Sequence, residues 1–293
     1  MPVPTLSKSM FEPFEYEFFV RGLIATTLVG GLCGLIGVYI VLRRMAYVGH
    51  GLSHAIFGGA VVSYVISINF YIGATIWGFV SAMLIILTTR KRQIGADAAI
   101  GIITTASFAL GVAIISRYKT FTRDFEAALF GNMLGVSQGD LLAIVVVAIA
   151  TGIILFLGYK LFLFATFDQE VARFYGVPTG WVDAVFSLVL AATIVVSMQV
   201  VGVTLIAAAI VIPPIVARLL TDSFKTMIPL STGLGAFCGF AGIYVSWYAD
   251  VSSGASVVLF AAALFVVVMA YTSIKSGLAS ARSKGVGARG SPP

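Results

Sequence analysis

The sequence predicts an all-α polytopic membrane protein with about nine transmembrane helices. Of its 293 residues, 59% are hydrophobic and 10% are charged, and the mean hydropathy is +1.05. Soluble domains carry about 25% charged residues, so this chain has too few polar side chains to cover a water-soluble surface. Glycine contributes 31 residues, a high content that is typical of closely packed membrane helices. These observations exclude a soluble enzyme and indicate one membrane domain.

Long charge-free runs locate the spans, because a helix needs about 20 apolar residues to cross a bilayer. Two spans fit residues 45–89, and one span fits each of the runs 22–42, 98–116, 141–159, 226–249 and 251–274. The run 184–217 predicts two helices with a break near Gln199 and Gly202. Pro213 and Pro214 disturb the second of these helices. Such a break lines a cavity in some transporters, and a structural kink is an equal alternative.

Basic residues in the connections predict the orientation, because cytoplasmic loops carry the excess of lysine and arginine. With the N-terminus outside, thirteen basic residues fall on the inner side: Arg43, Arg44, Arg90, Lys91, Arg92, Lys160, Arg173, Arg218, Lys225, Lys275, Arg282, Lys284 and Arg289. The outer side holds only five, namely Lys8, Arg21, Arg117, Lys119 and Arg123. We therefore expect a multi-pass protein of the cell membrane with its N-terminus outside and its C-terminus in the cytoplasm.

This topology divides the chain into three parts. Residues 1–17 are expected to form an extracytoplasmic segment and residues 18–275 the transmembrane domain. Residues 276–293 lack an apolar pattern and predict a disordered, basic cytoplasmic tail. The net charge of +6 comes from short clusters between apolar runs, so it indicates topology and not a nucleic-acid surface.

The two histidines of the chain are the first candidates for metal contact. His50 and His54 lie four residues apart, so on a helix they share one face and could hold one ion between two imidazoles. Glycines flank them and would permit either a broken or a closely packed helix. The alternative is that both histidines are ordinary residues at the membrane interface near a helix end, with no role in metal binding. A zinc protease requires a glutamate directly after the first histidine, where this chain has Gly51.

The loop TFDQEVARFYGVP at residues 166–178 predicts a short amphipathic helix in the cytoplasm. Its apolar residues recur at helical spacing and form one face: Phe167, Val171, Phe174 and Tyr175. Its charged residues follow the polarity of a helix, with acids at the start and a base near the end: Asp168, Glu170 and Arg173. Gly176 and Pro178 end the helix. Between two spans, such a helix suits docking to a partner protein; a helix lying on lipid is the alternative.

Other polar residues allow structural interpretations. Asp97 and Asp183 each stand at the start of an expected span, where a carboxylate acts as a helix N-terminal charge. The segment FGNMLG at residues 130–135 follows the charged outer loop and resembles a short re-entrant or interfacial element. The chain contains no GxxxxGK[ST] phosphate loop, so ATP hydrolysis would have to come from another chain.

Six stretches together resemble a known family. They are RRMAYVGHGLSHAIFGG, DAAIGI, FGNMLGV, FDQEVARFYGVP, MQVVGVTLIAAAIVIPPIVAR and GASVVL, spread over residues 23–274. In this order they are similar to the permease subunit of ABC-3 family bacterial ABC transporters, which import manganese, zinc or iron. The resemblance implies a fold similar to the vitamin B12 importer class and a homodimer. It also implies two cytoplasmic ATP-binding subunits, which hold the ATP, and an extracytoplasmic metal-binding protein.

The resemblance also implies which residues act. The family's metal-contacting histidine falls on His54, and the acidic residue that usually precedes it by four positions falls on His50, which is a departure. Imidazole suits zinc, iron, nickel and copper, whereas carboxylate favours manganese. We therefore expect a slight preference for zinc, with manganese or iron as the other candidate cargoes. The family's ATPase-docking helix falls on residues 167–176.

The expected function is thus a permease, not an enzyme, that carries a divalent transition metal inward and binds no permanent cofactor. A permease of similar fold for a metal chelate, such as a siderophore or cobalamin, is the first alternative. A stand-alone ion-coupled carrier is a second, although such carriers usually keep ionisable residues within their spans, and these spans are nearly charge-free. An intramembrane enzyme would need a base–nucleophile pair, which the sequence does not offer.

Overall fold

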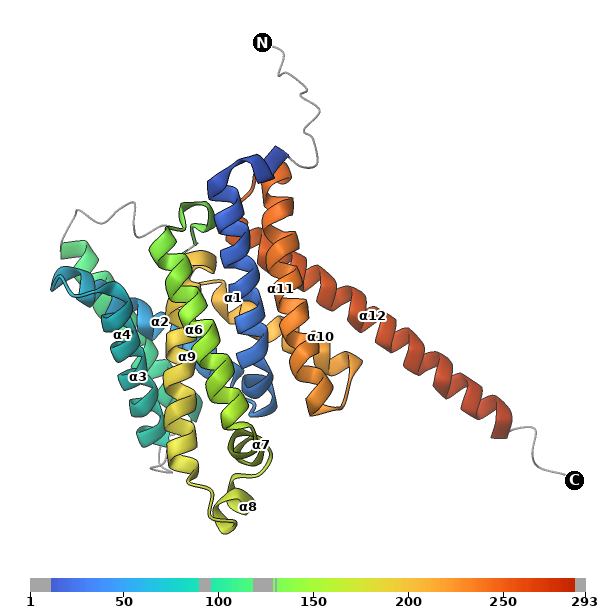
Figure 1. The fold of residues 1–293 in the computed structure, drawn as a ribbon. Helices are drawn as coiled ribbons and strands as arrows, with labels where there is room; N and C mark the ends of the chain where they lie inside the picture. The colour runs from blue at the N-terminus through green and yellow to red at the C-terminus, as the bar shows by residue number, and fades with distance from the viewer. Residues whose placement is uncertain (1–11, 90–95, 118–128, 130, 288–293) are drawn as a thin grey trace, which may run out of the picture.

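The computed structural model describes residues 12–89, 96–117, 129 and 131–287, and there every regular element is a helix (Figure 1). The α-helices are α1 (Glu17–Leu42), α2 (Ala46–Val65), α3 (Phe70–Thr89), α4 (Ala96–Arg117), α6 (Gln138–Leu157), α7 (Tyr159–Phe167), α8 (Gln169–Phe174), α9 (Thr179–Val201), α10 (Ile206–Leu220), α11 (Phe224–Ala249) and α12 (Ser253–Gly287). Two short 3₁₀ helices, η1 (Glu12–Glu15) and η2 (Met133–Gly135), complete the set. The all-α prediction is confirmed.

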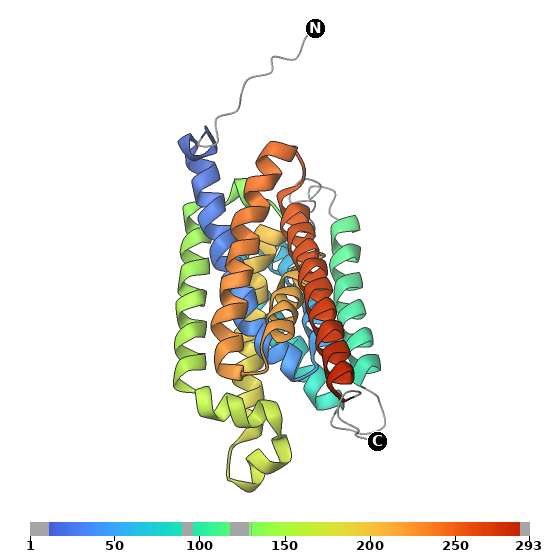
Figure 2. The same ribbon diagram turned by 90° about the vertical axis from the view of Figure 1, so that its right-hand side faces the viewer.

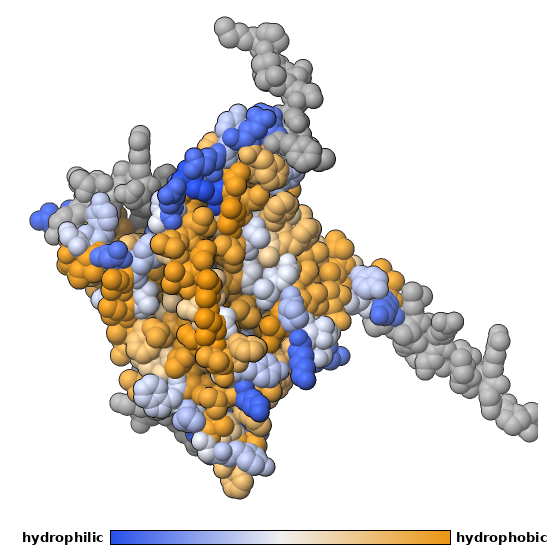
Figure 3. All heavy atoms as spheres, in the orientation of Figure 1, coloured by the Kyte–Doolittle hydropathy of each residue, from blue (hydrophilic) through white to orange (hydrophobic). Residues whose placement is uncertain are grey.

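Seven of the described helices are long and apolar enough to cross a membrane: α1, α3, α4, α6, α9, α11 and α12. The apolar helix α10 has only 15 residues, and α2, which carries both histidines, is not among the seven. The polytopic membrane class is therefore confirmed, whereas the count of nine spans is not. Figure 3 shows the apolar surface that these helices present along the bundle.

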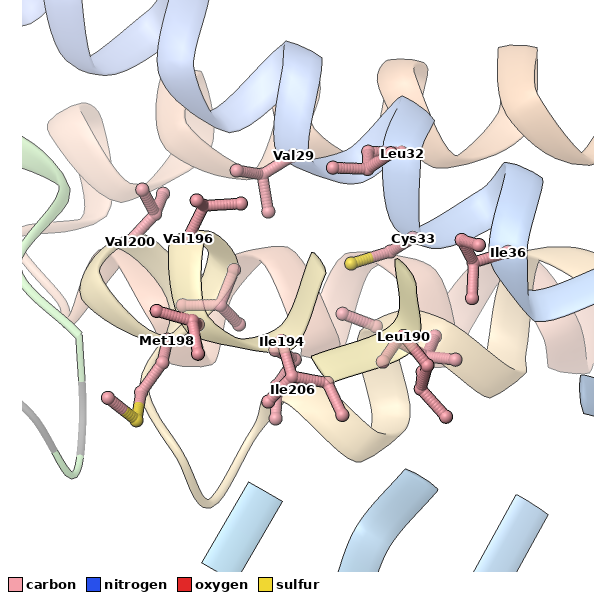
Figure 4. Packing of buried hydrophobic residues seen from close by; sticks show 14 of the residues in the cluster. Val29, Leu32, Cys33, Ile36, Leu190, Ile194, Val196, Met198, Val200 and Ile206 are labelled. Atoms are coloured by element: carbon pink, nitrogen blue, oxygen red, sulfur yellow. The ribbon is translucent and has the colours of Figure 1, made fainter. Parts of the chain in front are cut away.

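The helices differ in how much of their surface the protein covers. In α1 and α9, 72% of the most apolar stretch is buried, against 17% in α6 and 11% in α12. The core between α1 and α9 is filled by interlocking aliphatic side chains (Figure 4), among them Val29, Leu32, Ile36, Leu190, Ile194 and Val200. Because lipid tails are as apolar as these side chains, close packing and not exclusion from water holds such helices together. α1 and α9 thus form the centre around which the other helices lie (Figures 1 and 2).

Glycines bring α1 and α11 into backbone contact. A Cβ atom on Gly30 would lie 2.2 Å from the carbonyl oxygen of Gly235, and one on Gly34 would lie 2.3 Å from that of Ser231. The Ser231 hydroxyl donates a hydrogen bond of 2.7 Å to the carbonyl oxygen of Gly34. Small residues allow this approach and a serine bridges the two backbones, as is common between membrane helices.

The predicted break between α9 and α10 is confirmed. α9 ends at Val201 and Gly202 takes a positive φ of 90°. The main chain around η2 closes this break: the Leu129 carbonyl accepts hydrogen bonds from the backbone and the hydroxyl of Thr204, at 3.3 and 2.8 Å. Asn132 N–H donates to the Gln199 carbonyl at 3.2 Å. Within the FGNMLG segment, whose Phe130 lies outside the described residues, Asn132 thus bonds to the last turn of α9 next to the break.

α10 continues through its two prolines. Pro214 removes the N–H group that would bond to the Ile210 carbonyl. Gly37 of α1 lies against this same carbonyl, since a Cβ atom there would approach its oxygen to 2.0 Å. The prolines therefore leave α10 helical and mark the place where α1 packs against a carbonyl freed by Pro214.

α12 extends beyond its expected end. It reaches Gly287, although disorder is predicted from residue 276. The stretch contains alanine, leucine, lysine and arginine, which have high helix propensity, and it continues an existing helix without a new nucleation step. Residues 1–11 of the predicted outer segment and 288–293 of the tail lie outside the described residues.

Candidate functional site

The histidine-bearing helix α2 is continuous and tightly packed. A Cβ atom on Gly58 would lie 2.0 Å from the Ser107 carbonyl oxygen of α4, and one on Gly59 would lie 2.2 Å from Cβ of Trp77 in α3. Of the two options that the flanking glycines allowed, a broken or a closely packed helix, the structure shows the second. α3 and α4 therefore fix the position of α2.

His50 and His54 lie together on one face of α2, as their spacing predicts. Their ring centroids are 4.9 Å apart and the rings are nearly perpendicular, at 83°. His50 is exposed and His54 is half-buried, with the Phe108 ring of α4 edge-on at 5.2 Å. No hydrogen bond ties either imidazole to the part of the chain that the structure describes, so their nitrogens are available to a ligand.

The histidine pair offers only two protein ligands. Among the described residues, no three histidine, cysteine, aspartate or glutamate side chains gather into one potential metal site. A structural zinc site uses four protein ligands and is closed. An ion between His50 and His54 would instead complete its coordination with water or with groups from elsewhere, and it could leave again. Such an arrangement suits passage and not permanent storage.

The segment 166–178 contains the predicted short helix, with its predicted start and stop. The carboxylate of Asp168 accepts hydrogen bonds of 2.9 Å from the backbone N–H groups of Glu170 and Val171, as an N-cap does. At the other end Gly176 takes a positive φ of 76° and its N–H donates to the Arg173 carbonyl at 3.0 Å. The helix α8 is shorter than the segment, because Phe167 still belongs to α7 and Asp168 is extended.

The apolar residues of this segment do not lie on one continuous helix, because Phe167 ends α7 and Asp168 is extended. Phe167 is 61% exposed, and its ring contacts the bundle edge-on, with its centroid 5.9 Å from that of Phe224 in α11. Phe174 is 87% exposed and packs against Tyr175, which is exposed as well. α8 and its flanking turns project at the end of the molecule away from the described N-terminal residues (Figures 1 and 2). The structure thus leaves an aromatic pair exposed at the end of a capped helix.

A buried ion pair next to this segment was missed by the sequence analysis. Arg43 Nη1 lies 3.0 Å from the Asp183 carboxylate, and the two side chains are only 4% and 18% exposed. Asp183 is therefore not a helix N-terminal charge: α9 begins at Thr179, and the carboxylate points to Arg43. The sequence signal was weak, since the arginine pair before α2 is equally explained as a cytoplasmic loop.

The Arg43 side chain connects three elements. Its Nε donates a hydrogen bond of 3.1 Å to the Thr166 hydroxyl of α7, and its guanidinium carbon lies 4.6 Å from the Phe186 ring centroid of α9. Gln169 of α8 donates to the other oxygen of Asp183 at 3.5 Å. Burial lowers the pKa of Arg43, and Asp183 opposes that shift. We call Arg43, Thr166, Gln169, Asp183 and Phe186 the Arg43 junction.

The junction lies directly before α2. Arg43 is the C-cap of α1, and α2 begins at Ala46. A cavity of about 320 Å³ adjoins it, lined by residues of α2, α3, α4 and α9 together with Arg43 and Arg44. Asp97 lines this cavity from the first turn of α4, the position that the sequence predicts. Segment 166–178 and the start of the histidine-bearing helix thus meet at one ion pair.

Comparison with known proteins identifies the family. Residues 15–272 match the model of the ABC 3 transport family. The chain is 37% identical over 264 residues to the manganese transport system membrane protein MntC of Halalkalibacterium halodurans, covering 90% of each chain. It is 31% identical over 277 residues to a probable iron transport system membrane protein of Haemophilus influenzae, covering 94% of this chain and 98% of that protein.

Two solved structures agree with the fold. PsaBC from Streptococcus pneumoniae, in complex with Fab, matches with a TM-score of 0.82 and 32% identity, covering 88% of this chain and 94% of that chain. An inward-facing putative metal-chelate type ABC transporter matches with a TM-score of 0.69 at 16% identity, which shows a shared fold alone. These matches confirm the resemblance found in the sequence motifs. The chain belongs to the ABC 3 transport family, as a membrane permease subunit whose ATPase is a separate chain.

Proposed function

We propose that this permease imports manganese across the cell membrane and that His50 and His54 contact the ion in transit. The observation that carries this proposal is the pair of imidazoles on one face of α2, 4.9 Å apart and without a hydrogen bond to the described residues. Relatives named as manganese transport proteins support the choice of metal. They do not support the slight preference for zinc expected from the two imidazoles. Under this proposal, His50 and His54 offer the manganese ion two nitrogen ligands.

The proposed working unit has two copies of this chain, two ATP-binding subunits and an external metal-binding protein. The N-terminus lies outside and the C-terminus inside, which places α8 in the cytoplasm. The surface formed by Phe174 and its neighbours docks the ATPase. Glu170 and Arg173 add charge to this surface, and Arg173 is held to α9 by a hydrogen bond of 2.9 Å to the Thr179 hydroxyl.

Motion would pass from the ATPase to the metal path through the Arg43 junction. The junction joins α7, α8 and α9 to Arg43, which precedes the first residue of α2 by three positions. A buried, multiply bonded side chain resists local distortion, so a displacement of α8 is passed on to α2 and not absorbed between them. Alternating access then changes which side of the membrane His50 and His54 face.

The test is ATP-driven uptake into vesicles that contain the complete complex. We would load the external binding protein with manganese, zinc or ferrous iron and compare wild type with His54→Ala and His50→Asp. His54→Ala should lose most uptake. His50→Asp should keep manganese uptake and weaken competition by zinc, because a carboxylate favours harder ions.

Thr272→Val serves as the matched control. Thr272 is a polar residue on the lipid-exposed helix α12, and its hydroxyl bonds only to its own helix. Its variant should transport normally. Unchanged uptake and unchanged metal preference in both histidine variants would remove the pair from the path. ATP-independent uptake would remove the permease mechanism itself.

A further inference from the structure

We propose that a groove on the outer surface of the helix bundle is a binding site for an anionic phospholipid. The groove has a volume of about 940 Å³ and lies between α1, the α6–α7 bend and the start of α11. Pockets that enclose small molecules have volumes of about 300–1,000 Å³. The groove is therefore large enough to hold part of a lipid and not merely to touch its surface.

The walls of the groove suit an acyl chain. They are formed almost entirely by apolar side chains: Leu35, Leu155, Phe156, Leu161, Ile228 and Pro229. Phe156 and Leu157 are about four-fifths exposed, at 81% and 79%, where the chain bends at Gly158. Gly152 leaves a gap in the wall of α6, because a Cβ atom there would meet no atom within 4 Å. A flexible hydrocarbon chain fits this irregular apolar surface.

The rim of the groove suits a phosphate. Lys160 and Lys225 line it, both are exposed, and neither lies within ion-pair distance of a carboxylate in the described part of the chain. Each lysine is the second residue of its helix, and the first turns of α7 and α11 contain no acid. An ammonium group is unfavourable there, because a helix N-terminus is itself positive. Asp222, although nearby in sequence, does not line the groove. An anionic headgroup supplies the missing charge.

The groove also lies at the end of the bundle where anionic lipid headgroups are expected. It opens near α7 and the start of α11, the end of the bundle that carries α8 (Figure 1). By the distribution of basic residues this is the cytoplasmic end, where the leaflet is rich in anionic lipid and basic pockets between transmembrane helices bind phosphate headgroups. Figure 3 shows hydrophilic residues along the lower part of this apolar face. The lipid site does not depend on which metal the permease carries.

The first experiment measures headgroup selectivity in nanodiscs. Spin-labelled phosphatidylglycerol and spin-labelled phosphatidylcholine are compared by the fraction that the full-length protein immobilises. A basic side chain near an anionic surface contributes about fivefold in affinity, so two lysines give a preference of up to about thirtyfold for phosphatidylglycerol. The Lys160→Ala/Lys225→Ala variant should bring this preference close to one.

A matched charge control separates a site from general attraction. Arg218 and Lys275 are exposed residues of α10 and α12 and do not line the groove. The Arg218→Ala/Lys275→Ala variant loses the same two charges and should keep the preference. Equal loss in both double variants, or no preference in the wild type, would overturn the proposal.

The second experiment fills the groove. Gly152→Phe places a ring into the groove without a backbone clash and should abolish immobilisation of phosphatidylglycerol. Gly233 of α11 is equally open but lies outside the groove, so Gly233→Phe should bind lipid as the wild type does. Equal lipid binding by the two variants would contradict the proposal. An oligomer that forms without lipid and that only Gly152→Phe dissociates would show that a second copy fills the groove instead.

Discussion

The histidine pair and the Arg43 junction are both polar features in an apolar bundle, yet they are built in opposite ways. The imidazoles of His50 and His54 make no hydrogen bond to the described residues; His50 is exposed and His54 is partly exposed. Arg43 is 4% exposed and bonds to Asp183 and Thr166. Under the proposed function, the histidines that bind and release an ion have to remain free, whereas the arginine that transmits motion has to be fixed.

This comparison predicts the largest loss of stability at the junction. Arg43→Ala leaves the Asp183 carboxylate without its partner, and breaking a buried ion pair costs about 3–5 kcal/mol. Thermal unfolding of the purified protein in detergent should show a large fall in the midpoint. Arg44→Ala is the control, because Arg44 is exposed and surface changes usually stay within about 0.5 kcal/mol. Equal midpoints for the two variants would mean that the junction is not a structural link.

A second prediction replaces both members of the Arg43–Asp183 ion pair. Arg43→Met with Asp183→Leu removes both charges, so no unpaired buried charge remains, and such replacements are often neutral or stabilising. The double variant should therefore unfold at a higher temperature than Arg43→Ala while ATP-driven uptake stays impaired. Recovery of both stability and uptake would show that apolar packing alone transmits the motion.

The next largest loss of stability is expected at Gly58, where α2 packs closely against α4. Gly58→Leu forces a side chain against the Ser107 carbonyl, and overpacking a close contact costs about 1–3 kcal/mol. Gly101→Leu on α4 is the control, because a Cβ atom there meets nothing within 4 Å. The Gly58 variant should unfold earlier and lose uptake. If both variants behaved alike, α2 would not depend on its close contact with α4.

How far the sequence predicts this structure depends on whether a feature is local. The Asp168 cap and the Gly176 stop were predictable because one side chain and one backbone conformation define them. The four-residue spacing of His50 and His54 likewise places them on one helix face. The Arg43–Asp183 pair joins residues 140 positions apart, and no local pattern indicates which distant carboxylate an arginine meets.

The distinction between local and long-range features also explains the other differences between the predicted and the observed structure. The break at Gly202 was visible in the sequence, but its closure by the main chain around Leu129 was not, because that closure uses backbone groups, which every residue carries. The expected apolar face of segment 166–178 assumed one continuous helix. The extended residue Asp168 divides that segment, so the Phe167 ring contacts Phe224 of α11 whereas the Phe174 ring contacts Tyr175.

A smaller effect is expected at the start of α8. Asp168→Ala removes the two capping hydrogen bonds, which costs about 1 kcal/mol, and α8 should fray while the bundle stays folded. Proteolysis near residue 170 should become faster, with an unchanged unfolding midpoint. Asp168→Asn keeps an acceptor oxygen and should behave as the wild type. Similar proteolysis of both variants would argue against the cap.

Substitution of Phe174 is expected to have the smallest effect on stability and a large effect on coupling to the ATPase. Because its ring is 87% exposed, Phe174→Ala should leave the unfolding midpoint within the range of ordinary surface changes, about 0.5 kcal/mol. Phe167→Ala, the matched aromatic, removes a ring that is 61% exposed but packs edge-on against Phe224, and should lower the midpoint more than Phe174→Ala does. If α8 docks the ATPase, Phe174→Ala alone should reduce copurification of the ATP-binding subunit and abolish uptake from an otherwise intact permease. A Phe174→Ala protein that retains the subunit and transports normally would move the docking surface away from α8, and the Arg43 junction would then have no input to transmit.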